Sequence, residues 1–181
     1  MLFIITGNGK GKTTSALGMI ARASGQGLKC AVLQFLKSNP TSLGEYKTFT
    51  QLGIPWHTYG CGFLWNQDSL APTQELCQQG WQYFKAIAQD GCYDMILLDE
   101  FTYVLSQHIL EPEPILSYLR SNIANTNRSD SPSSTKFPHV IITGRDAPQD
   151  LINLADTVSE IKEIKHHYYT NGGKTLRGIE F

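Results

Sequence analysis

The residues best placed to do chemistry are Lys12 and Thr13, in the segment Gly7-Asn8-Gly9-Lys10-Gly11-Lys12-Thr13-Thr14. An apolar run at 3–6 precedes this segment and a helical pattern follows it, which is the order that a phosphate-binding loop requires. Glycines allow positive φ and a close approach to the ligand, so backbone amides and the helix N-terminus can surround an anion. Lys12 supplies a mobile positive charge for phosphate oxygens, and the Thr13 hydroxyl is placed to ligate Mg²⁺. The alternative is an ordinary glycine turn, and Thr6 stands where the general pattern has glycine.

Two carboxylates, Asp99 and Glu100, directly follow the apolar run 95–98. A carboxylate at the end of a buried strand is where Mg²⁺ would bridge Thr13 and the phosphates. Acidic residues also cap helices that follow strands, which is the structural alternative. The sequence leaves open which of the two carboxylates contacts the ion. Arg145, after another apolar run, either completes the charge balance around phosphate or pairs with Asp146 at the surface.

Two aromatic residues, Phe63 and Trp65, lie in a segment that begins with glycines. They either pack this loop into the core or form a wall against a flat ligand. His166 and His167 are adjacent in a stretch predicted to be strand-like, where neighbouring side chains point to opposite faces. We therefore do not expect them to share one metal site.

The composition limits the class of protein. The 181 residues are 41% hydrophobic, which suits one domain with a sizeable core. A net charge of −1 supplies no basic field, so we do not expect a nucleic-acid partner. We expect no membrane span. The four cysteines form no C-x-x-C pair and indicate neither a zinc site nor a disulfide framework. These features are typical of a cytoplasmic protein.

Apolar runs alternate with helical patterns along the chain. The predicted strands are 30–36, 54–59, 95–98, 140–143 and 157–165, in addition to the first run, with Pro55 favouring an edge position for 54–59. The predicted helices are 15–24, 45–52, 73–89, one beginning at Pro112, and 148–155, and the polar stretch 122–138 is predicted to be a mobile loop. This alternation predicts an α/β protein with a parallel sheet and right-handed crossovers.

Ligands of parallel α/β sheets bind at the carboxyl ends of the strands. The loop at 7–13, the Asp99-Glu100 pair and Gly144-Arg145 each follow a predicted strand. The sequence therefore predicts that these three segments form one site.

Several motifs together resemble the P-loop ATP:corrinoid adenosyltransferases of the CobA/BtuR/CobO type. The glycine loop with Thr6 is similar to that family's own variant. The segment 62–65 resembles its G-F-T-W motif, and 97–103 resembles its L-D-E-[LF]-T-Y block. The segments 141–145 and 154–160 are similar to its I-I-T-G-R and L-A-D-x-V-[ST]-E runs. The resemblance covers nearly the whole chain in the right order.

The resemblance implies a three-layer P-loop NTPase fold of RecA-like type with a mostly parallel sheet. It implies that a corrinoid Co(I) attacks C5′ of ATP and expels triphosphate, with ATP bound in the reverse direction to other P-loop proteins. The acceptor would be cobalamin or a cobyrinic acid a,c-diamide type of corrinoid. The partners would be an electron donor such as a reduced flavoprotein and a second subunit in a homodimer.

The resemblance also assigns roles to residues. Lys12 and Glu100 would be catalytic, and Thr13 and Glu100, or Asp99, would hold Mg²⁺. The loop residues 7–14 and Arg145 would bind the triphosphate. Phe63 and Trp65 would shield the lower face of the corrin ring, exclude an axial ligand and ease reduction to Co(I).

Two other functions use the same residues. In a RecA-type ATPase or phosphotransferase, Glu100 would activate water or an acceptor. A corrinoid carrier or nucleotide switch would bind both ligands without forming a Co–C bond. Two features depart from the family pattern: an N-terminal extension is expected to be missing, and the Ser-rich stretch 127–137 resembles an insertion.

Overall fold

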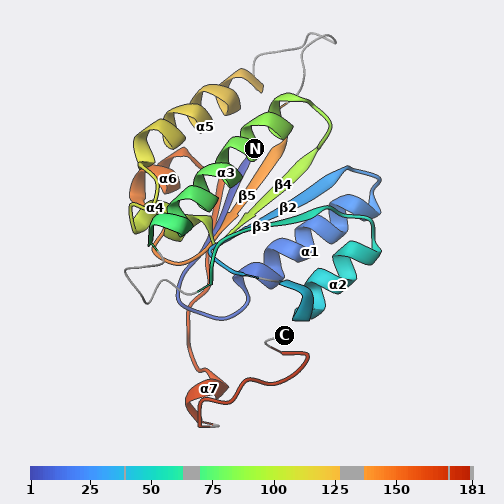
Figure 1. Ribbon diagram of the computed structural model, residues 1–181, viewed down its shortest axis with the longest axis vertical. Coiled ribbons are helices and arrows are strands. Elements are labelled where there is room, and N and C mark those ends of the chain that lie inside the picture. Colours follow the sequence, from blue (N-terminus) through green and yellow to red (C-terminus); the bar gives the residue numbers. More distant parts are fainter. Residues whose placement is uncertain (39, 63–69, 127–136, 171, 180–181) are drawn as a thin grey trace.

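The apolar runs of the sequence form one parallel six-stranded sheet in the computed structural model, which describes residues 1–38, 40–62, 70–126, 137–170 and 172–179 (Figure 1). The strand order is β3-β2-β4-β5-β1-β6. The strands are β1 (Leu2–Thr6), β2 (Cys30–Phe35), β3 (Trp56–Tyr59), β4 (Met95–Asp99), β5 (His139–Thr143) and β6 (Thr157–Glu160). All five strand pairings are parallel.

Helices cover both faces of this sheet (Figure 1). One face carries α1 (Lys12–Gly25) and α2 (Gly44–Gln51), with the short 3₁₀ helix η1 (Pro40–Ser42) before α2. The other face carries α3 (Leu70–Gln89), α4 (Phe101–Ser106), α5 (Pro112–Thr126) and α6 (Gln149–Leu154). Helix α7 (His167–Thr170) lies in the C-terminal tail, away from the sheet. The predicted three-layer α/β fold is confirmed.

Alternate residues of the central strands enter two separate cores. In β4, Ile96 and Leu98 belong to the cluster beneath α3, α4 and α5, whereas Met95 and Leu97 belong to the cluster beneath α1 and α2. Both faces of the strand are therefore apolar. This explains why the central strands appear in the sequence as continuous apolar runs rather than as alternating patterns.

The edge position predicted from Pro55 is confirmed, because β3 is the last strand on one side of the sheet. The strand predicted over 157–165 is shorter than expected, since β6 ends at Glu160. The residues of β6 are all exposed, so little apolar burial extends this edge strand.

The boundary of the predicted loop 122–138 was wrong at its start, because α5 continues to Thr126. Ile123 extends the apolar stripe of Ile115 and Leu119 at a spacing of four residues and is buried in the same core. The amide of Asn122 donates to the carbonyl of Tyr118 at 2.8 Å. The polar composition of this stretch concealed one more turn of an amphipathic helix.

Candidate functional site

The glycine loop connects β1 to α1 and packs against the chain segment that follows β6. The Gly9 amide donates to the Ile161 carbonyl at 2.8 Å, and the Ile161 amide donates to the Thr6 carbonyl at 2.8 Å. A Cβ on Gly9 would lie 2.8 Å from the Lys162 backbone. Only Gly7 and Gly11 of the loop glycines take positive φ, at 98° and 114°. Gly9 is therefore required for close packing rather than for an unusual backbone conformation.

Lys12 occupies the first turn of α1 with its side chain buried along the loop. Its Nζ donates to the Gly9 carbonyl at 2.8 Å. Burial lowers the pKa of Lys12, and the positive charge of Arg145 lowers it further, against the opposing effect of Glu100 and Asp99. A partly desolvated ammonium group with one neutral partner is ready to exchange that partner for a phosphate oxygen.

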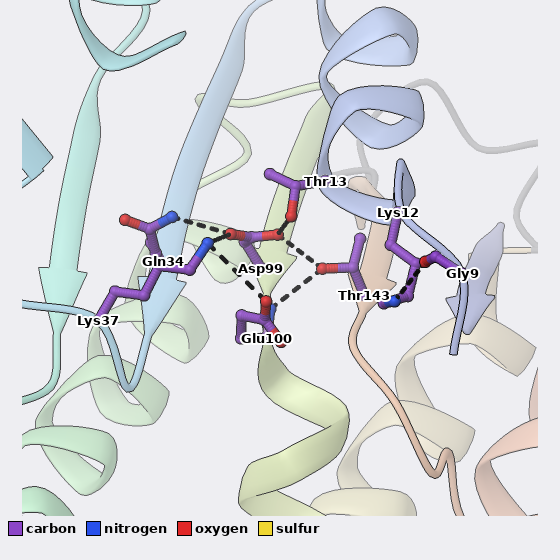
Figure 2. A network of polar contacts seen from close by, with 8 residues as sticks. All are labelled: Gly9, Lys12, Thr13, Gln34, Lys37, Asp99, Glu100 and Thr143. Atoms are coloured by element: carbon purple, nitrogen blue, oxygen red, sulfur yellow. Dashed lines mark hydrogen bonds and ion pairs between the residues drawn. The ribbon is translucent and has the colours of Figure 1, made fainter. Parts of the chain in front are cut away.

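Asp99 is the centre of a polar network that joins four elements (Figure 2). Its Oδ1 accepts hydrogen bonds from the hydroxyls of Thr13, at 2.8 Å, and Thr143, at 2.7 Å. Its Oδ2 accepts from Gln34 Nε2 at 2.9 Å and lies 3.7 Å from Lys37 Nζ. The Asp99 side chain is fully buried. The network therefore holds the Thr13 hydroxyl, at the start of α1, against the carboxyl end of β4.

Glu100 lies just beyond β4 and differs from its neighbour in exposure. Its side chain is 21% exposed, and Oε1 lies 3.8 Å from Lys37 Nζ. Its φ of 61° is in the left-handed region, which a non-glycine residue adopts at a cost, and its amide donates to Thr143 Oγ1 at 3.0 Å. Burial raises the pKa of Glu100, and the negative charge of Asp99 raises it further, while Lys37, Lys12 and Arg145 oppose the shift.

Arg145 follows β5, which lies between β1 and β4 in the sheet. Its carbonyl accepts a hydrogen bond from Thr102 Oγ1 at 2.6 Å, and Gly144 leaves the space that Thr102 occupies. Arg145 and Asp146 are not joined by an ion pair among the described residues, and the charge of Arg145 affects the pKa values of Lys12 and Glu100. The arginine charge thus belongs to the same electrostatic environment as the loop.

The structure brings the three predicted segments to one end of the sheet. These segments contribute the glycines of the loop, Lys12 and Thr13 at the start of α1, the pair Asp99-Glu100, and Arg145. Asn8 and Lys10 are exposed on the loop, and Thr14 is exposed in the first turn of α1. Phe63 and Trp65 lie outside the described residues. His166 and His167 are not in a strand: His167 is the first residue of α7, and the two rings stack with centroids 4.9 Å apart.

Sequence reasoning missed Gln34, Lys37, Thr102 and Thr143, and the contact made by Ile161. Two signals in the sequence pointed to Gln34 and Lys37. Gln34 is the one polar residue in an apolar strand, and Lys37 follows a strand end as Asp99-Glu100 and Arg145 do.

A cavity of about 510 Å³ lies elsewhere, at the amino ends of β2 and β4, and is lined by Lys29, Pro55, Cys92 and Tyr93 among others. It contains none of the predicted site residues.

The donor set of the site fits a hard divalent cation. Hydroxyl and carboxylate oxygens from Thr13, Asp99 and Glu100 converge there, and Mg²⁺ prefers a few such ligands together with water and phosphate. Within the described ranges, no cluster of three or more His, Cys, Asp or Glu residues could hold a metal by itself. The described residues therefore supply part of a coordination shell, which water or phosphate oxygens would complete.

The fold and the site define the chain as a P-loop nucleotide-binding protein with a RecA-like sheet. The KaiC-like protein PH0186 from Pyrococcus horikoshii OT3 shares this fold, with a TM-score of 0.50 and 14% identity over 89% of this chain and 71% of that one. The model of the family "ATP:corrinoid adenosyltransferase BtuR/CobO/CobP" matches residues 1–181. The chain belongs to this family.

Relatives named as corrinoid adenosyltransferases match the chain over its full length. It is 35% identical over 184 residues to the corrinoid adenosyltransferase of Escherichia coli K12, covering 100% of this chain and 85% of that protein. The corrinoid adenosyltransferase CobA of Salmonella typhimurium LT2 is 34% identical over 181 residues, with the same coverage. That of Pseudomonas aeruginosa is 32% identical over 183 residues, covering 100% and 83%.

Proposed function

We propose that this chain transfers the 5′-deoxyadenosyl group of ATP to the Co(I) centre of a corrinoid and releases triphosphate, in adenosylcobalamin biosynthesis or salvage. The electron pair of Co(I) forms the Co–C5′ bond as the C5′–O5′ bond breaks, and the bonding electrons leave with the triphosphate. Co(I) is itself a strong nucleophile, so the protein's task is to orient C5′ and to stabilise a polyanionic leaving group.

The observation that carries the proposal is the 2.8 Å contact between Thr13 Oγ1 and Asp99 Oδ1. It connects the glycine loop to the carboxylates at the end of β4, so the elements proposed to bind phosphate and metal form a single unit. Lys12 adds its ammonium group from the same loop. Lys10 and Arg145 add further positive charge for the triphosphate.

Thr13 and Glu100 are the residues we propose to hold Mg²⁺, which, when bound, neutralises charge on the triphosphate. Asp99 already accepts hydrogen bonds from Thr13, Thr143 and Gln34 and is fully buried. Its oxygens are occupied, so we assign it to orienting Thr13. Glu100 is partly exposed and has carboxylate oxygens available to ligate the ion.

Further parts of the proposal concern partners and compartment. Phe63 and Trp65 are proposed to shield the lower corrin face, as the family motif suggests. We propose a reduced flavoprotein as the electron donor. We also propose a cytoplasmic location, because the four free cysteines suit a reducing compartment.

None of the described helices is long and apolar enough to cross a membrane. Exposed apolar side chains in the tail, such as Ile164 and Tyr169, support a homodimer, which light scattering would test.

The function is tested by an anaerobic assay with ATP, Mg²⁺ and chemically reduced cobalamin. We expect the visible spectrum of an alkylated corrinoid to appear with one equivalent of triphosphate. ADP as the product would indicate an ATPase or phosphotransferase instead. Binding of both ligands without a Co–C bond would indicate a carrier.

A further inference from the structure

Lys37 contacts both carboxylates of the site from the loop that follows the neighbouring strand β2. Its Nζ lies 3.7 Å from Asp99 Oδ2 and 3.8 Å from Glu100 Oε1 (Figure 2). Lys12, by contrast, donates to the Gly9 carbonyl on the other side of the network. Of these two lysines, Lys37 is therefore the one that forms direct ion pairs with the carboxylates.

The backbone conformation before Lys37 fixes this residue near the two carboxylates. Leu36 has a φ of 65°, in the left-handed region that β- and γ-branched residues seldom adopt. Its amide donates to the Tyr59 carbonyl at 3.0 Å, and its carbonyl accepts from the Gly62 amide at 3.0 Å. Gly60 lies so close to the Leu36 backbone that a Cβ would overlap it. This turn fixes the backbone directly before Lys37, whose side chain reaches Asp99 and Glu100.

The contacts of Lys37 allow this side chain to leave its two carboxylate partners. Both distances exceed those of hydrogen bonds, and the Lys37 side chain is 39% exposed, so it has room to swing into solvent. The Glu100 oxygen it approaches belongs to the carboxylate that we assign to the metal. A divalent ion bound by Glu100 and the ammonium group would repel each other, which favours displacement of the lysine.

We propose that Lys37 is a placeholder for the metal: it neutralises Glu100 and Asp99 in the nucleotide-free protein and is displaced when the metal–nucleotide complex binds. This inference rests on the proposed metal role of Glu100 and not on the identity of the acceptor. Lys37 is a positioning residue in this account, since its effect on the reaction acts through Glu100.

Metal binding without turnover tests the proposal directly. Mn²⁺ is titrated into the full chain without nucleotide, and free Mn²⁺ is followed by its electron paramagnetic resonance signal. Lys37→Met removes the charge and keeps much of the side-chain volume, so we expect it to bind Mn²⁺ about tenfold more tightly than the unaltered chain, a difference of about 1.4 kcal/mol. Lys47→Met is the matched control, because it removes the same charge from an exposed position on α2. It should leave the affinity within about twofold, since solvent screens such a charge.

Two further variants keep the test decisive. Glu100→Gln in the Lys37→Met background should abolish the gain in affinity, and a gain that survives this change would overturn the proposal because the metal would lie elsewhere. Lys37→Arg retains the cation and should bind Mn²⁺ no more tightly than the unaltered chain. Equal or weaker binding by a folded Lys37→Met variant also overturns the proposal. Failure of the proposed function appears separately, as ADP rather than triphosphate in the turnover assay.

Discussion

The backbone amide of Gly9 donates a hydrogen bond to the carbonyl oxygen of Ile161 at 2.8 Å. This contact joins the phosphate loop, near the N-terminus, to the segment that leaves the last strand of the sheet. Ile161 in turn donates to the Thr6 carbonyl at 2.8 Å, so the loop is held at two points. The loop is thus supported from the side by a segment distant in sequence as well as by its own strand and helix.

The first prediction concerns Gly9→Ala. The added Cβ would lie 2.8 Å from the Lys162 backbone and 2.9 Å from Ile161 Cγ2, so the loop or the supporting segment must move. We expect the free energy of unfolding to fall by about 1–3 kcal/mol, as for other overpacked sites, and the affinity for ATP to fall with it. Thermal unfolding and calorimetric titration measure the two effects.

Gly18→Ala is the matched control for that change. Gly18 lies inside α1 with no atom within 4 Å of an added Cβ. Alanine at an open helical position should stabilise the protein by about 0.5–1 kcal/mol and leave ATP binding unchanged. A Gly9→Ala variant that behaves like Gly18→Ala would remove the supporting role of Ile161.

The second prediction is that Lys12→Ala abolishes most activity and leaves the fold intact. Loss of one preorganised positive group should lower kcat by about 10²–10³. Lys12 Nζ donates to the Gly9 carbonyl, and the net loss of such a bond is about 0.5–1.5 kcal/mol, offset by removal of a desolvated charge. Turnover with pre-reduced cobalamin and the melting temperature are measured together. Near-normal turnover would place the phosphates elsewhere.

The third prediction separates the two carboxylates. Glu100→Ala should raise the Mg²⁺ concentration needed for half-maximal activity more than Asp99→Ala does, because Glu100 is the partly exposed carboxylate. Asp99→Ala should instead lower stability, since Thr13, Thr143 and Gln34 lose a buried acceptor. A loss of about 2 kcal/mol or more corresponds to a fall in melting temperature of roughly 4–8 °C for a chain of this size. The reverse ranking of Mg²⁺ requirements would make Asp99 the ligand.

The fourth prediction concerns Phe63 and Trp65. If they shield the lower corrin face, replacing either with Ala should impair the reaction that starts from Co(II) far more than the reaction of chemically generated Co(I), with little change in stability. If they pack in the core, both reactions should fall together, and stability should drop by roughly 3–5 kcal/mol. Phe84→Ala is the control for that second outcome, because Phe84 is a fully buried core residue. An equal loss in both assays together with a lower melting temperature would falsify the shielding role.

The α/β class, the strand ends that carry the site and most residues of the phosphate loop were predictable from local patterns. The reason is that these features depend on short segments. Four apolar residues before Asp99-Glu100 indicate a buried strand with charge at its end, and the run from Gly7 to Thr14 contains the whole predicted phosphate-binding motif. The edge position of β3 could also be predicted from local sequence, because Pro55 disfavours a central position in the sheet.

Only the tertiary structure determined which side chains complete the site. Asp99 meets Thr13 across 86 positions of sequence, Gln34 across 65 and Thr143 across 44. Such contacts follow from the strand order, which places β5 between β1 and β4 and β2 beside β4. The same sheet order buries Asp99 and leaves Glu100 partly exposed. This difference in exposure cannot be predicted from two adjacent acidic residues in the sequence. The support of Gly9 by Ile161 has the same origin, because β6 pairs with β1 and so brings a distant backbone against the phosphate loop.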